Sequence, residues 1–139
     1  IWYGMRKMSL DAKKDGERGE PAVRTVPMPA DANGNGDIFG GWVLSQMDIA
    51  GGVIASRRAQ GRVVTVTIDA MTFDRPIQVG DLVSIYGYVS ETGNSSITVE
   101  LETIVQRKMR GDEIKVTGGR FKFVAIDLEG RPRSLPTDE

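Results

Sequence analysis

One long segment without proline, residues 42–59, constrains the fold of this 139-residue chain more than any other feature. Its side chains are apolar in nearly every direction around a helical axis, with a single acidic residue, Asp48. We therefore predict a helix, although Gly51 and Gly52 each cost about 1 kcal/mol relative to alanine. Such a helix has to be covered on most sides. We expect the two glycines to let it press closely against a sheet.

Four segments after this helix have the composition and alternation of strands. They are rich in Val, Ile, Thr and aromatic residues and cover residues 63–73, 82–91, 96–108 and 115–127. A shorter segment, 22–28, ends in prolines and predicts an edge strand. Polar residues in the third long segment predict a sheet with one solvated face: Thr98, Glu100, Glu102 and Thr103. The order predicts an α+β fold, an antiparallel meander covering one helix.

The sequence predicts a single domain over residues 21–139. Residues 1–20 are charged, interrupted by glycine and begin with Ile1, so we interpret them as a disordered or expression-derived lead-in. No stretch approaches the roughly 20 apolar residues that span a bilayer. We therefore expect a cytoplasmic protein that does not enter membranes.

Composition excludes several classes of chemistry. There are 18 basic and 19 acidic residues, a formal net charge of −1, which gives no electrostatic basis for binding nucleic acid. Cysteine and histidine are absent, which removes thiolate nucleophiles, Ser-His-Asp triads and the usual zinc sites. Proton transfer near pH 7 would fall to a carboxylate, Lys, Tyr or bound water.

The loop before the helix imitates a calcium-binding loop without completing it. Its first eight positions fit, but the twelfth should be a bidentate Glu and is Trp42; the matching residues are Asp31, Asn33, Asn35, Gly36 and Ile38. We therefore expect no calcium site in this loop.

Gly40 and Gly41 stand where the predicted helix begins. A helix N-terminus offers unpaired N–H groups and the positive end of a dipole, both suited to a developing oxyanion. Asn33 and Asp37 lie in the same loop. An ordinary flexible connection between strand and helix is the alternative interpretation.

Asp48 is the strongest candidate for a reactive group. In a helix so apolar we expect its carboxylate to be largely buried, and a buried carboxylate has to be protonated, paired or functional. It is either a structural aspartate or a general base or nucleophile. Gly40 lies eight residues away, about 12 Å along a helix. If both residues act on the same substrate bond, Gly40 and Asp48 have to come from two different chains. The interpretation as an enzyme therefore requires a dimer.

From about Val23 to Pro136 the chain resembles the hotdog-fold acyl-CoA thioesterases, specifically the YciA-like group. The most specific motifs are NGNGDIFGGW at 33–42 and SQMD at 45–48. Further matches are RTVPMP at 24–29, GRVVTV at 61–66, VGD at 79–81 and GRPRSLP at 130–136. One departure is Phe39, because wider relatives often have His there.

The resemblance implies a curved antiparallel sheet wrapped around one long central helix, two such units pairing into a double hotdog. It implies that Asp48 is the catalytic carboxylate, Gly40 the oxyanion donor, and that Asn33 polarises the carbonyl or places water while Thr65 orients water. Asn33 and Gly40 would come from one subunit and Asp48 and Thr65 from its partner. The implied reaction is hydrolysis of acyl-CoA, without metal or organic cofactor, in a homohexamer built as a trimer of dimers.

The resemblance also implies that coenzyme A is held near contacts between dimers. The candidates for this are Arg62, Val64, Ser95, Ser96 and Arg120, with Arg131 and Arg133 as further arginines. Two other functions compete. A hotdog hydratase would need a proton-shuttling group, usually His, which the chain lacks. A non-catalytic module that binds or senses acyl-CoA stays open.

Overall fold

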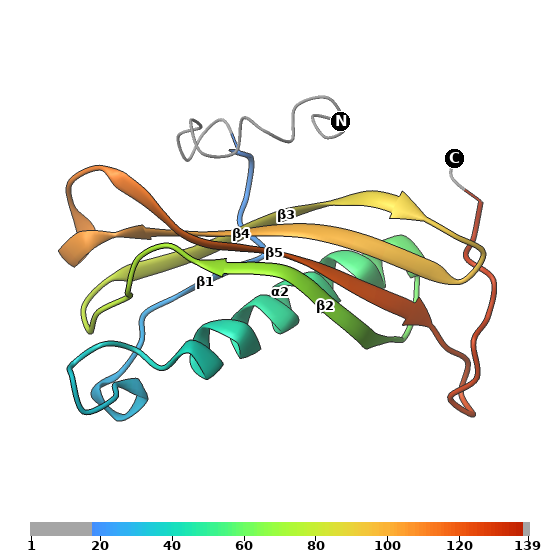
Figure 1. Cartoon of the computed structure of the whole chain (residues 1–139). Coiled ribbons are helices and arrows are strands. Elements are labelled where there is room, and N and C mark those ends of the chain that lie inside the picture. The colour runs from blue at the N-terminus through green and yellow to red at the C-terminus, as the bar shows by residue number, and fades with distance from the viewer. Residues whose placement is uncertain (1–17, 138–139) are drawn as a thin grey trace.

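A computed structural model of the chain describes residues 18–137. One long helix, α2 (Gly40–Ala59), lies along one face of an antiparallel sheet (Figure 1). The strands are β1 (Val23–Thr25), β2 (Val63–Phe73), β3 (Leu82–Thr92), β4 (Ser96–Gln106) and β5 (Glu113–Ala125). Two short 3-10 helices, η2 (Pro29–Asp31) and η3 (Arg107–Met109), complete the elements of this part of the chain. The predicted α+β architecture is confirmed.

The helix packs against the sheet through its small residues and a few large ones. Its buried positions are Val43, Met47, Ala50, Gly51, Ala55 and Ala59. A Cβ on Gly51 would lie 2.8 Å from the Phe123 ring, which confirms the expected close approach to the sheet. Gly52 faces open space, so the same expectation is wrong for this second glycine.

The strands lie in the order β1-β3-β4-β5-β2. Strands β3, β4 and β5 form a meander, as predicted, and residues 93–95 make the turn between the first two of them. The expectation that all four long strands follow one another across the sheet is wrong. Strand β2 pairs with β5, at the edge opposite β1, so the chain passes β5 and β4 between β2 and β3. This crossing leaves β2 as an edge strand beside the helix.

The predicted solvated face is also misplaced. On β4, Thr98, Glu102 and Thr103 are buried. Glu102 forms an ion pair with Arg18, whose Nε lies 3.2 Å from Oε1 of Glu102. Strand β2 is instead the exposed one, with nine of its eleven residues open to solvent. Arg18 is itself buried, so the folded unit begins at least three residues before the predicted boundary at residue 21. Residues 1–17 of the predicted lead-in lie outside the described part.

Candidate active site

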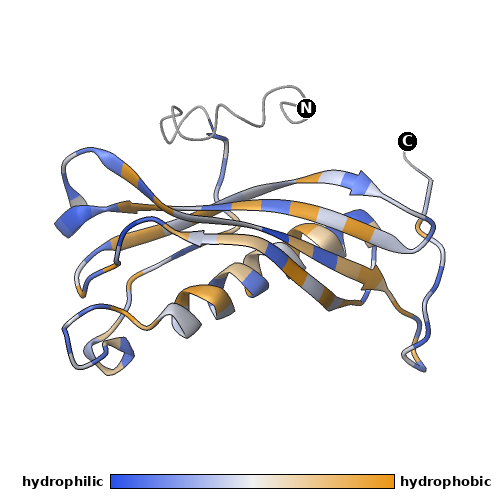
Figure 2. Ribbon diagram, viewed as in Figure 1, coloured by the Kyte–Doolittle hydropathy of each residue, from blue (hydrophilic) through white to orange (hydrophobic). Residues whose placement is uncertain are grey.

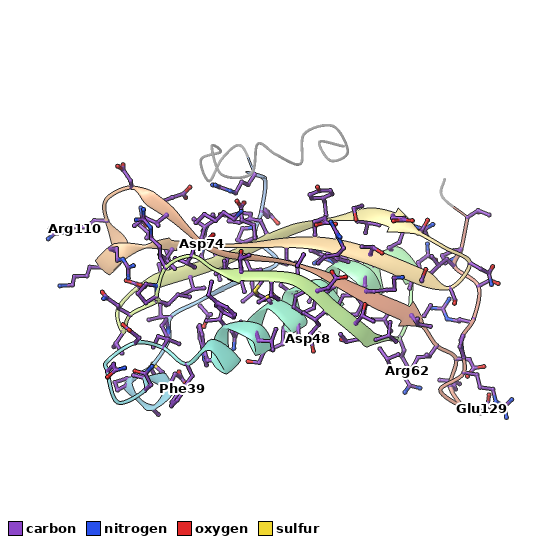
Figure 3. All side chains as sticks on the ribbon, in the orientation of Figure 1. Phe39, Asp48, Arg62, Asp74, Arg110 and Glu129 are labelled. Carbon is purple, nitrogen blue, oxygen red and sulfur yellow. The ribbon has the colours of Figure 1, made fainter. Side chains whose placement is uncertain are left out.

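A hydrogen bond between Asp48 and Thr65 joins α2 to the edge strand β2. The Thr65 hydroxyl donates to Oδ1 of Asp48 over 2.6 Å. That length lies within the normal range for an O–H···O hydrogen bond. Asp48 is half-buried, on the helix beneath the sheet (Figure 3), so the expectation of a carboxylate enclosed in the core is wrong. The sheet covers one side of the helix and leaves the Asp48 side partly open.

Exposed apolar side chains flank this pair. The helix contributes Ile49, which is 54% exposed, and Figure 2 shows hydrophobic residues along α2 and on β2. The large exposed residues of β2 are Val64, Val66, Ile68 and Phe73. As an edge strand, β2 has unpaired backbone groups as well as these exposed apolar side chains. A surface of this kind is typically covered by another chain in an assembly. Asp48 therefore lies at the margin of a candidate interface.

Gly40 is the first residue of α2, and Phe39 precedes it as the N-cap, with φ −56° and ψ 138°. The carbonyl of Phe39 accepts the N–H groups of Trp42 and Val43 at 3.0 and 3.4 Å. Within residues 18–137, the N–H of Gly40 has no acceptor. A free N–H at a helix N-terminus is a suitable donor for an oxyanion.

Asn33 holds the shape of the loop before the helix. Its side-chain oxygen accepts the N–H groups of Asn35 and Asp37 at 2.8 and 3.1 Å, and its backbone N–H donates to Asp37 at 2.7 Å. The side-chain NH₂ of Asn33 has no acceptor among the described residues. This group is therefore available to a ligand.

The two halves of the predicted site lie apart in a single chain. Gly40 and Asp48 are eight residues apart on α2, about 12 Å at 1.5 Å per residue. Figure 3 labels Phe39 at the beginning of the helix and Asp48 well along it. One chain therefore brings Asp48 and Thr65 together, and separately Asn33 and Gly40, but it does not join the two pairs.

A cavity of about 330 Å³ opens beside Gly40. Its buried lining residues are apolar except for Thr117, whereas Phe73, Asp74 and Arg75 at the end of β2 are exposed. The other lining residues are Ile38, Val43, Pro76, Ile77, Val116 and Thr117. The volume is at the lower end of the range for small-molecule pockets. Sequence patterns did not single out this lining, because its residues come from three separate parts of the chain, 38–43, 73–77 and 116–117.

The predicted coenzyme A residues fall into two places. Val64 and Ser96 are both paired with Val124, so they lie in one row across β2, β5 and β4. Ser95 and Arg62 lie near the same end of the sheet: the Ser95 carbonyl accepts from Ala125, and Arg62 reaches the carbonyls of residues 127 and 128 at 3.4 Å. These four residues gather at one end of the sheet. That they bind the nucleotide of coenzyme A stays a prediction.

Arg120 and Arg133 are engaged elsewhere, whereas Arg131 is exposed. Arg120 lies four residues from this row along β5 and donates to Glu100 at 2.8 Å; that hydrogen bond, with the charge of Glu100, raises the pKa of Arg120. Arg133 donates to the carbonyl of Ala59 at 2.8 Å, which satisfies a backbone acceptor at the end of α2. The contacts of Arg133 indicate a role in the fold.

Over the described range, no helix is long and apolar enough to cross a membrane. The same range contains no group of three or more Asp or Glu side chains placed to hold a metal ion.

The chain packs one helix on a five-stranded antiparallel sheet and places a carboxylate at the open side of the helix. Comparison with known proteins identifies the class to which this arrangement belongs. The model of the thioesterase superfamily matches residues 35–110, and this chain belongs to that superfamily. Its sequence is 47% identical to the acyl-CoA thioester hydrolase YciA of Escherichia coli over 124 residues, 87% of this chain and 94% of the relative.

Two solved structures resemble this chain closely. One is an aspartate-to-alanine mutant of a hexameric broad-specificity acyl-coenzyme A thioesterase, with a TM-score of 0.83 and 44% identity over 87% of this chain and 89% of that one. The other is a hexameric hotdog fold thioesterase of Campylobacter jejuni, with a TM-score of 0.82 and 38% identity over 86% and 92% of the two chains. The predicted family and hotdog fold are confirmed.

Proposed function

We propose that this chain is a cytoplasmic acyl-CoA thioesterase, which hydrolyses acyl-CoA to a free carboxylic acid and coenzyme A. The observation that carries the proposal is the Asp48 carboxylate, held by Thr65 at the open side of α2 in a member of the thioesterase superfamily. The substrate class is supported by the names of relatives such as YciA. The only co-substrate is water, and we propose no cofactor.

The proposed chemistry uses one carboxylate and a set of N–H donors. Asp48 takes a proton from water as the water oxygen attacks the thioester carbonyl. The resulting oxyanion accepts a hydrogen bond from the backbone N–H of Gly40. When the C–S bond breaks, coenzyme A leaves as a thiolate and takes up the proton. Direct attack by Asp48 is the other route, through an anhydride that water then hydrolyses. Asn33 would support the carbonyl oxygen through its side-chain NH₂ in both routes.

The site is completed by a second copy of the chain. Because Gly40 and Asp48 are about 12 Å apart on one helix, one carbonyl cannot contact both in the same chain. We propose that two copies meet along β2 and α2, covering the exposed apolar residues there, with helices antiparallel so that Gly40 of one faces Asp48 of the other. Three such dimers would form a hexamer, the assembly named for solved relatives.

The remaining parts of the substrate are assigned by chemistry. The largely apolar cavity beside Gly40 would take the acyl chain, because it adjoins the proposed oxyanion donor. The nucleotide would lie near Arg62, Val64, Ser95 and Ser96, where polar groups and an arginine gather at one end of the sheet. Arg120 would join them only by giving up part of its pairing with Glu100.

The decisive test is free-thiol release from acyl-CoAs of increasing chain length. We expect Asp48→Asn to lower kcat by about 100- to 10,000-fold, the usual contribution of a general base. The matched control is Asp112→Asn, which makes the same change at an exposed turn position. Equal turnover by Asp48→Asn and wild type would refute the assignment. Tight binding of acyl-CoA without thiol release would identify a binding module instead.

A complementation experiment tests the two-chain site. Gly40→Pro removes the N–H donor and leaves the backbone path in place, because proline suits the first helical position and the ψ of 138° at Phe39 is compatible with a following proline. Its Cβ would meet the Phe73 ring at 3.7 Å, an ordinary van der Waals contact. Mixed assemblies of Gly40→Pro and Asp48→Asn should regain about a quarter of wild-type activity, since half of the dimers are mixed and each holds one intact site. No recovery, in assemblies shown to be mixed, would place Gly40 and Asp48 in a one-chain site.

A further inference from the structure

The segment between β2 and β3 is held by a buried carboxylate, that of Asp81, which is 1% exposed. Its Oδ2 accepts the backbone N–H of Gln78 at 2.9 Å and Nη1 of Arg107 at 2.6 Å. A buried carboxylate is strongly unfavourable without such partners. The pair with Arg107 therefore fixes how the segment turns into β3.

Arg107 also holds the other end of the same segment. Its Nη2 donates to the carbonyl of Pro76 at 3.0 Å, while Nη1 is bonded to Asp81. Arg107 belongs to η3, after β4, so it approaches from a distant part of the chain. Because a guanidinium is planar and its donors are fixed in a fork, one side chain determines the separation of the two ends.

The opposite edge of this segment supports the loop that precedes α2. The carbonyl of Ile77 accepts the N–H of Ile38 at 2.8 Å, and Asp37 forms an antiparallel bridge with Gln78. Ile38 and Ile77 are both buried. Ile38 is two residues before Gly40, so this contact fixes the direction from which the chain enters the helix.

We propose that Asp81 and Arg107 are positioning residues for the donors Gly40 and Asn33, acting through the segment 76–81 and the loop 33–39. This inference rests on the proposed function. Neither residue touches the substrate. Their ion pair holds the segment, the segment holds Ile38, and Ile38 sets where the Gly40 N–H points. A displacement of about 1 Å in such a donor can cost about 100-fold in rate.

The test compares Arg107→Gln with Arg58→Gln. Arg58 also donates to a backbone carbonyl at 3.0 Å, that of Pro136, but it lies at the far end of α2. We expect Arg107→Gln to lower kcat by about 10- to 100-fold with KM changed less than about threefold, because the donors are misdirected while the substrate pocket remains. Arg58→Gln should keep both constants.

Hydrogen–deuterium exchange gives a readout that does not depend on activity. The peptide covering residues 33–43 should exchange faster in Arg107→Gln than in wild type and should be unchanged in Arg58→Gln. If Arg107→Gln fails to fold, Arg107→Lys provides the test instead. Its ammonium group keeps Asp81 paired but lacks the forked donors that also contact the carbonyl of Pro76. We expect this variant to lose about 3- to 10-fold in kcat.

Three results would overturn the proposal. The first is unchanged exchange in residues 33–43, the second is faster exchange with normal kcat, and the third is a loss that falls on KM alone. Absence of thiol release by the wild-type protein would instead refute the proposed function. The exchange comparison would then still decide whether Arg107 holds the loop.

Discussion

Replacement of Thr65 by valine isolates the one hydrogen bond that orients the proposed catalytic carboxylate. Valine has nearly the same shape and the same preference for strands, so the change removes the hydroxyl and little else. A hydrogen bond to a charged group contributes about 1.5–3 kcal/mol. Because Asp48 is half-exposed and water can replace part of the contact, we take the lower value. At 1.36 kcal/mol per factor of ten, kcat should fall about tenfold.

The assay is thiol release at saturating acyl-CoA, with two matched variants. Thr67→Val makes the same substitution on the same strand, but Thr67 is paired with Lys122 and lines a different surface from Asp48, so kcat should not change. Thr65→Ser keeps a hydroxyl and should retain most of the activity. Equal kcat for Thr65→Val and Thr67→Val would show that the 2.6 Å contact is not used in turnover.

Three further predictions concern stability and specificity. Gly51→Ala should lower the free energy of unfolding by about 1–3 kcal/mol, because its Cβ would meet the Phe123 ring at 2.8 Å, whereas Gly52→Ala should raise it by about 0.5–1 kcal/mol; denaturant titration of both checks this. Burial raises the pKa of Tyr88 above 10.0, so the unfolding free energy should decrease as the pH rises beyond 10.0, and less steeply in Tyr88→Phe. Val43→Phe should fill part of the cavity beside Gly40 and shift preference toward shorter acyl chains, by about fourfold in kcat/KM for each methylene excluded.

Most of the secondary structure followed from local patterns. The helix begins two residues before the predicted start and ends at the predicted Ala59, and the predicted strand 63–73 is unchanged. The third strand ends at Gln106 rather than 108, because residues 107–109 form a 3-10 helix. These elements were predictable because alternation and the absence of proline act within each segment.

Strand order was not predictable in the same way. Consecutive strands often pair, which favoured a meander, but β2 lies beside β5. The prediction of a solvated face from residue polarity was wrong for a related reason, because burial also depends on distant parts of the chain. Glu102 is polar and yet buried, because Arg18, 84 residues earlier, is brought against it. Nothing near Glu102 in the sequence indicates that partner.

The sequence by itself determined the available chemistry and its carriers. Without histidine or cysteine, the candidates reduce to a carboxylate and backbone donors, and Asp48 and Gly40 stand out in the motifs around the helix. Only the tertiary structure decided that the Thr65 hydroxyl donates directly to Asp48, that β2 is left open beside both, and that Arg107 reaches Asp81. The physical reason is that local patterns reflect the burial of each segment, whereas these contacts depend on which distant segments become neighbours when the sheet closes over the helix.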